Sequence, residues 1–137
     1  MHQGPWKLKM NKMEQFSVYS ERCPSRNVLE AISDKWSILI ITVLARKLFR
    51  FGELRREIGG ISQKMLMQTL QKLERYGFVM REVYPVLPMK VEYSLTPLGK
   101  ELSSILNIFT TWTETHMNEI MQSEQFFLNK LEETLNN

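Results

Sequence analysis

The sequence has few of the residues from which covalent or metal-held frameworks are built. It contains one cysteine, Cys23, and two histidines, His2 and His116. One cysteine cannot form an intramolecular disulfide, and these three residues are too few and too far apart for a structural zinc site. A chain without disulfides is typical of a reducing compartment. The sequence therefore predicts a cytoplasmic protein that holds no metal and no other cofactor.

Long apolar runs and a secretory signal are also missing. The longest apolar stretch, Trp36 to Ala45, is interrupted by Ser37 and Thr42. It has about half of the ~20 residues that cross a bilayer. The basic N-terminal residues 1–13 are not followed by the apolar segment of a signal peptide. We therefore expect no membrane partner.

Catalytic motifs are absent as well. The two histidines are isolated, there is no glycine-rich phosphate loop, and serine, histidine and aspartate do not cluster. We therefore expect no enzymatic activity. What remains is the composition of one globular domain: 137 residues, of which 43% are hydrophobic and 24% are charged.

The net charge of +3 is distributed unevenly along the chain. Residues 46–90 carry 10 basic and 4 acidic side chains, a net charge of +6, whereas residues 91–137 carry 2 basic and 7 acidic ones, a net charge of −5. Positive charge in the middle third favours a surface that faces a polyanion. On charge alone, an ordinary solvated face is an equal alternative.

Apolar residues recur with helical spacing along most of the chain and change once to a period of two. Helices are predicted around residues 13–19, 24–32, 34–47, 51–58, 62–76 and 97–121, with a further helical stretch towards the C-terminus. Glycines at 59, 60 and 77 suit helix ends, because a left-handed residue costs least as glycine. Strand-like segments at 78–84 and 90–95 flank the Pro-rich loop 85–88, which predicts a hairpin with a projecting tip.

This order of elements predicts a mainly α fold with a small β-hairpin: a winged helix-turn-helix with flanking helices for dimerisation. We expect an N-terminal tail and short helix at 1–22, a DNA-binding domain at 23–121, and a C-terminal helical extension at 122–137.

The predicted helix at 62–76 has two different faces. Leu66, Thr69, Leu70 and Leu73 fall on one arc, which predicts the core face. The remaining surface carries amide and basic side chains that can contact bases or phosphates, with free N–H groups at the helix start. The candidate DNA-binding residues there are Ser62, Gln63, Lys64, Met67, Gln68, Gln71, Lys72 and Arg75. The alternative is a helix face that only keeps the protein soluble.

Basic residues also flank this helix in the sequence. Arg81 and Lys90 lie on the predicted hairpin, and the turn before the helix at 51–58 contains Arg46, Lys47 and Arg50. In a winged helix these positions meet the neighbouring DNA backbone or minor groove. Lys90 is the stronger candidate on the hairpin, since Arg81 has the alternative of packing against Tyr93.

The run from Cys23 to about Met121 resembles the HxlR-type winged helix-turn-helix transcriptional regulators, which are related to the MarR group. The matching pieces, in the family's order, are Cys23-Pro24, Asp34-Lys35-Trp36, Arg50-Phe51-Gly52-Glu53-Leu54, Gly60-Ile61-Ser62-Gln63-Lys64-Met65-Leu66, Leu73-Glu74, Tyr76-Gly77, Val91-Glu92-Tyr93-Ser94-Leu95-Thr96 and Leu98-Gly99. The resemblance implies a dimeric DNA-binding regulator with residues 62–75 in the major groove and 84–90 as the wing. Because Met67 stands where the family favours a small polar residue, no operator sequence is carried over.

Cys23 has two interpretations. Some members of the HxlR-type family, which this sequence resembles, sense oxidants through a cysteine at this N-terminal position. The predicted helix start and the nearby Arg22 and Arg26 favour the thiolate form of Cys23, whereas Glu21 opposes it. The alternative is a small buried apolar residue, a common state of free cysteine. With one cysteine per chain, oxidation requires an intersubunit disulfide or a small thiol.

The predicted C-terminal helix carries a heptad-like apolar seam. A single helix of about 25 residues, or ~37 Å, would present it to a second copy. The candidate dimer residues are Met13, Phe16, Leu102, Ile105, Phe109, Trp112, His116 and Ile120. The alternative is that the monomer buries this seam by itself.

Together these features predict a sequence-specific DNA-binding transcriptional regulator that acts as a homodimer on a palindromic operator of double-stranded DNA. Control by redox chemistry or by a small-molecule effector is a further hypothesis. The alternative function is a winged-helix module that binds a protein or RNA partner.

Overall fold

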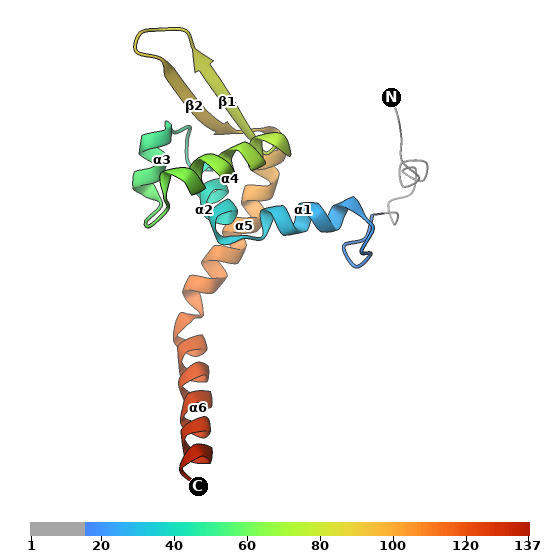
Figure 1. Cartoon of the computed structure of the whole chain (residues 1–137), viewed down its shortest axis with the longest axis vertical. Helices are drawn as coiled ribbons and strands as arrows, with labels where there is room; N and C mark the ends of the chain where they lie inside the picture. Colours follow the sequence, from blue (N-terminus) through green and yellow to red (C-terminus); the bar gives the residue numbers. More distant parts are fainter. Residues whose placement is uncertain (1–15) are drawn as a thin grey trace.

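The computed structural model describes residues 16–137, in which helices surround a two-stranded hairpin (Figure 1). The elements are α1 (Pro24–Ile32), α2 (Lys35–Leu44), α3 (Phe51–Glu57), α4 (Gln63–Arg75), β1 (Val79–Tyr84), β2 (Lys90–Leu95), α5 (Pro97–Thr115) and α6 (Met117–Asn136). This order confirms the predicted mainly α winged helix-turn-helix fold. None of the helices in the described part is long and apolar enough to cross a membrane.

Short polar side chains start three of the helices. The Asp34 carboxylate accepts a hydrogen bond from the Ser37 backbone N–H at 3.1 Å, and the Ser62 hydroxyl accepts one from the Met65 N–H at 3.0 Å. The Thr96 hydroxyl does the same for α5. Each cap satisfies an N–H that has no partner inside the helix.

Glycines occupy the two backbone positions with positive φ among residues 16–137. Gly60 has a φ of 84° in the turn between α3 and α4, and Gly77 has a φ of 86° directly after α4. A side chain would be strained in this left-handed region. These two residues therefore set where α4 begins and where it ends.

The hairpin is fastened to the helices at its root. β1 and β2 pair antiparallel from Val79 opposite Leu95 to Tyr84 opposite Lys90. Phe49, in the turn after α2, exchanges two backbone hydrogen bonds with Tyr93 at 3.0 and 2.8 Å. The hairpin formed by β1, β2 and the loop between them, called the wing below, therefore leaves the domain in a fixed direction.

The core lies between α2, α3, α4 and the root of the hairpin. Its fully buried side chains include Ile40 and Ile41 of α2, Leu54 of α3, and Leu66 and Leu73 of α4. α2 is central, since it contacts α5 and α4. This packing holds α4 against the body and leaves its opposite face outward.

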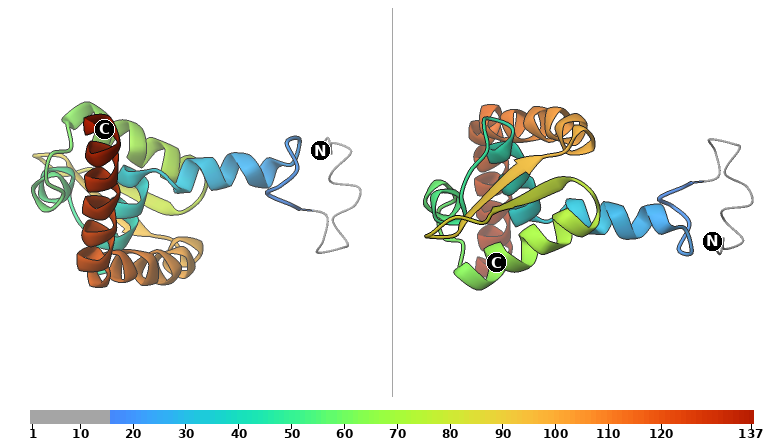
Figure 2. Two further views of the ribbon diagram at one scale, coloured as in Figure 1. Left: turned by 90° about the horizontal axis from the view of Figure 1, so that it is seen from below. Right: turned by 90° about the horizontal axis from the view of Figure 1, so that it is seen from above.

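The C-terminal region differs from the single helix predicted over 97–121. α5 ends at Thr115, His116 has a φ of −102° and a ψ of 10°, and the chain turns sharply into α6 (Figure 2). Thr113 and Thr115 hydroxyls donate to the carbonyls four residues earlier. Such side-chain bonds favour bending, but Thr69 makes the same bond within the unbroken α4, so they do not by themselves explain the position of the break. α6 then runs through position 122 without interruption.

The N-terminal part also differs from the prediction. Residues 16–22, where the short helix was expected to end, form turns in which the Ser20 N–H donates to the Ser17 carbonyl. The Cys23 N–H donates to the Ser20 carbonyl in the same way. The candidate dimer residue Met13 lies outside the described residues.

Candidate nucleic-acid interface

The outward face of α4 is the first part of the interface. Leu66, Thr69, Leu70 and Leu73 are buried, which confirms the predicted core arc. The residues that the sequence places on the rest of the helix surface are exposed: Ser62, Gln63, Lys64, Met67, Gln68, Gln71 and Arg75. A carboxylate, Glu74, is also exposed, but its helical position lies to one side of the face opposite the leucines. That opposite face therefore presents amides and cations together.

Lys72 occupies a different environment from the other predicted contacts on α4. Its ammonium group lies 2.6 Å from the Asp34 carboxylate, which also caps α2 through Ser37. Burial opposes ionisation of Asp34, but the hydrogen bonds from Lys72 and Ser37 outweigh it, so the pKa of this carboxyl lies below its ordinary value. Lys72 thus braces α4 against α2, and its charge is partly neutralised.

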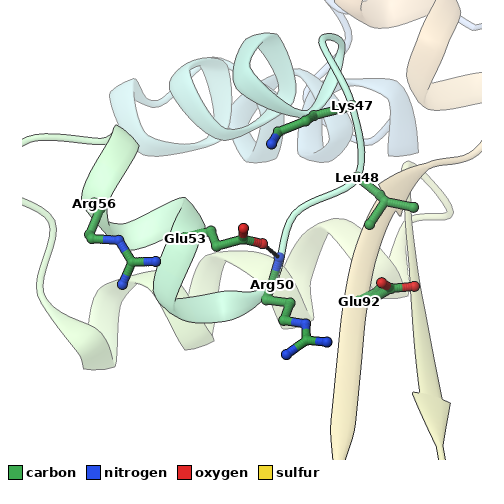
Figure 3. Close-up of a pocket in the computed structure, with 6 residues that line it drawn as sticks. All are labelled: Lys47, Leu48, Arg50, Glu53, Arg56 and Glu92. Carbon is green, nitrogen blue, oxygen red and sulfur yellow. Dashed lines mark hydrogen bonds between the residues drawn. The ribbon is translucent and has the colours of Figure 1, made fainter.

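Arg50 lies in a basic pocket that includes residues not singled out from the sequence. The pocket has a volume of about 570 Å³ and is bounded by α3, the turn before it and β2 (Figure 3). Its walls are Lys47, Leu48, Arg50, Glu53, Arg56 and Glu92. Three cations and two carboxylates share this space, so the pocket is suited to one or two phosphate oxygens.

Glu53 organises this basic pocket. Its carboxylate accepts a hydrogen bond from the Arg50 backbone N–H at 2.8 Å, and this bond lowers the pKa of Glu53, as do the nearby charges of Lys47, Arg50 and Arg56. Glu53 therefore remains ionised and holds the turn in place. Arg56 was missed in the sequence; its separation of three residues from Glu53, on one helix face, was the available signal.

The wing places Arg81 beside α4. It stands opposite Tyr93 in the strand register, next to the residue against which the sequence suggested it could pack. Together with Met67, Gln71 and Glu74 it lines a second pocket of about 320 Å³ between α4 and the wing. The structure thus groups Arg81 with two of the α4 candidates.

Lys90 is engaged within the wing. Its ammonium nitrogen lies 3.4 Å from a Glu92 carboxylate oxygen and 4.9 Å from the centroid of the Tyr84 ring. The Tyr84 hydroxyl donates to Glu82, and Glu82 and Glu92 together raise the pKa of Tyr84 to about 12. The single lysine of the hairpin therefore has local carboxylate and aromatic partners.

Cys23 has features of both interpretations given above. Its side chain is only 8% exposed, as expected of an apolar residue, and it occupies the N-cap position of α1. Its sulfur accepts hydrogen bonds from the Ser25 hydroxyl at 3.0 Å and the Ser17 N–H at 3.3 Å. The bond from Ser25 lowers the pKa of the thiol, although burial opposes this effect.

The predicted dimer seam is largely uncovered in the single chain. Ile105 is 64% exposed and Trp112 is 53% exposed, and Phe109 and Ile120 are exposed as well. The other candidates in the described part are Phe16, which is exposed, and Leu102 and His116, which are half-buried. The His116 ring stacks on Trp112 with centroids 4.6 Å apart. A monomer therefore leaves apolar side chains of α5 and of α6 exposed.

Comparisons with known proteins point to one family. A family model described as HxlR-like helix-turn-helix matches residues 31–121. A relative from Escherichia coli strain K12, an uncharacterized HTH-type transcriptional regulator named YtfH, is 44% identical over 110 residues, which cover 80% of this chain and 87% of the relative.

Solved structures agree with this family match. The structure of ytfH from Salmonella typhimurium, which is named a transcriptional regulator, superposes on this chain with a TM-score of 0.76 at 42% identity. The superposition covers 80% of this chain and 98% of the ytfH chain. A redox regulator, HypR, in its reduced form superposes with a TM-score of 0.66 at 36% identity, covering 72% of this chain and 98% of its own.

Proposed function

The chain belongs to the HxlR-like helix-turn-helix family, and from this premise we propose that it acts as a homodimer on a palindromic DNA operator. It is a transcriptional regulator rather than an enzyme, in agreement with its relatives. The observation that carries the proposal is the outward face of α4, which is exposed and bears amides and cations opposite its buried leucines. The proposed location is the cytoplasm, where such a protein meets DNA.

In this proposal α4 lies in the major groove and its side chains read base edges. Gln68 and Gln71 can each bond the N6 and N7 positions of adenine, and Lys64 can reach guanine O6 and N7 or a phosphate. All three are exposed and lie on the face away from the core. Lys72 is assigned to the brace with Asp34 instead of to the bases.

The basic pocket and Arg81 supply contacts to the DNA backbone. Lys47, Arg50 and Arg56 surround a space beside the N-terminal half of α3, and Arg81 extends the positive surface along the other side of α4. Contacts to phosphates set the register of the protein on the duplex and make the affinity depend on salt. Sequence preference then comes from α4.

The homodimer is proposed from the apolar surface of the flanking helices. α1 and α6 are the described helices without a buried residue, and both project from the body (Figure 1). Exposed apolar patches of this extent are typical of interfaces. Because a two-fold interface uses the same patch on both copies, the operator should be a palindrome with half-sites about 34 Å apart. α6 leaves the domain at the end opposite the wing, which keeps its acidic residues away from DNA.

Redox control through Cys23 is a second proposal. It is supported by the hydrogen bonds that lower the pKa of the thiol and by the similarity to HypR, which is named a redox regulator. A peroxide would oxidise the thiolate to a sulfenic acid and be reduced itself, and in the absence of another cysteine this sulfenic acid would condense with a small thiol or with the partner's Cys23, forming a disulfide and releasing water.

Selection of duplexes from a randomised library tests the function directly. Repeated rounds should enrich an inverted repeat, and binding of the enriched duplex should weaken steeply as salt rises. The enriched sequence with one half-site scrambled is the matched control. No enrichment, or binding that is indifferent to salt, would instead favour a protein or RNA partner.

A further inference from the structure

The tip of the wing is apolar and carries no charge. Residues 85–89 read Pro-Val-Leu-Pro-Met. Leu87 is fully exposed at 100%, Met89 is 68% exposed, and Val86 is exposed as well. A single exposed leucine would be ordinary, but three neighbouring exposed apolar side chains at the end of a projecting hairpin are typical of a surface that meets a partner.

Lys90, the cation of the wing that lies nearest to this tip, already has local partners. The Lys90 ammonium group is held by Glu92 and lies over the Tyr84 ring. Glu82 and Glu92 stand opposite each other in the strand register, so the stem near the tip carries two carboxylates for one lysine. An ionic contact between this part of the wing and the DNA backbone is therefore disfavoured.

The tip is held in position by local structure. Proline rings at 85 and 88 restrict the backbone on both sides of Leu87, and the Val86 N–H donates to the Tyr84 carbonyl at 2.8 Å. A loop ordered in this way loses little conformational entropy when it enters a narrow groove.

The length of the wing matches the spacing of the DNA grooves. Strands of six residues extend about 20 Å at ~3.3 Å per residue. The minor groove lies about 17 Å along the helix axis from the centre of the major groove, which is half of the ~34 Å turn. The wing rises from the end of the domain that carries α3 and α4 (Figure 1), so it can reach the minor groove beside the half-site.

We propose that Leu87 of each wing enters the minor groove beside its half-site as an apolar wedge, with Val86 and Met89 against the sugar walls. Leucine, methionine and proline side chains wedge between base steps in other minor-groove binders. Flexible pyrimidine–purine steps unstack at the lowest cost. This inference rests on the proposed binding of DNA by α4, and it assigns a preference for a TA or CA step in the flank of each half-site.

The first test compares the affinity of wing variants for the enriched duplex at several salt concentrations. Leu87→Ala should weaken binding by about tenfold per half-site, since it removes most of the buried apolar side chain. The slope of log affinity against log salt should stay the same, because no charge is lost. Met80→Ala, at the exposed root of the wing, should change neither quantity and is the matched control for hairpin stability.

The second test detects the wedge in the DNA. With 2-aminopurine at the flanking step, wild-type protein should raise the fluorescence as the base unstacks, and Leu87→Ala should raise it much less. Wild-type protein that binds the duplex without this change, or a Leu87→Ala variant of undiminished affinity, would overturn the wedge while leaving DNA binding by α4 intact. A wild-type protein that binds no duplex would overturn both proposals.

Discussion

The Asp34–Lys72 ion pair joins α4 to α2, and its contribution to the free energy of unfolding can be measured. The carboxylate accepts hydrogen bonds from Lys72 at 2.6 Å and from the Ser37 hydroxyl at 2.7 Å, and it caps α2. Asp34→Ala removes the cap, which contributes about 1 kcal/mol. It also removes a partly exposed ion pair, which contributes at most about 1 kcal/mol after allowance for solvent screening. We expect the free energy of unfolding to fall by about 2 kcal/mol.

Two further variants separate these contributions. Asp34→Asn keeps a good helix cap and loses the charge, so the free energy of unfolding should fall by only about 0.5–1 kcal/mol. Lys72→Met should cost a similar amount. Urea unfolding, followed by circular dichroism at one fixed protein concentration, gives each value. The variant that combines Asp34→Asn with Lys72→Met should show a coupling energy between the two positions of about 0.5–1 kcal/mol.

The pH dependence carries a definite sign. The pKa of Asp34 is lower in the folded protein than the ~3.9 of an unfolded aspartate. Its contribution to stability is therefore fully present above about pH 4 and is lost as the pH falls through the folded value. The stability gap between wild type and Asp34→Asn should close in that acid range. A coupling energy near zero would show that the ion pair does not link α4 to α2. A difference in the free energy of unfolding that stays unchanged down to pH 2 would show the same.

Three other predictions test the proposed function. Lys64→Ala and Gln68→Ala should fold normally and weaken specific DNA binding by ~1–3 kcal/mol each if they contact bases, and unchanged affinity in both anisotropy titrations would contradict the docking of α4. Trp112→Glu should convert the dimer to a monomer of 16.3 kDa in light scattering and abolish tight operator binding; a wild-type chain that is already monomeric at micromolar concentration would refute the assembly. Diamide with glutathione should change the DNA affinity of the wild type and not of Cys23→Ser, whereas equal responses would assign Cys23 to the core.

Much of the architecture follows from interactions between near neighbours in the chain. Asp34, Ser62 and Thr96 each cap the helix that follows them, and Gly60 and Gly77 occupy left-handed positions. Such signals act over three or four residues and are therefore readable in the sequence. The outward face of α4 was predictable for the same reason, since burial of its leucines fixes which side chains lie opposite.

Contacts between distant segments were not readable in this way. Lys72 looked like one more cation at the edge of α4, but it is paired with Asp34, 38 residues earlier. Arg56 became part of a basic pocket because the turn at Lys47 and strand β2 pack beside α3. Periodicity assigns a residue to a face of its own element and is silent on which other element lies against that face.

In the C-terminal helices, too, local features were predictable and the arrangement of the helices was not. Helices with one apolar side were predictable from the sequence for residues 97–136, because spacing and capping are local properties. The sequence did not show that the chain turns at His116, where the backbone leaves the helical conformation. The direction of α6 became visible only in the folded chain, since a helix that contacts little but α5 takes its direction from that one junction.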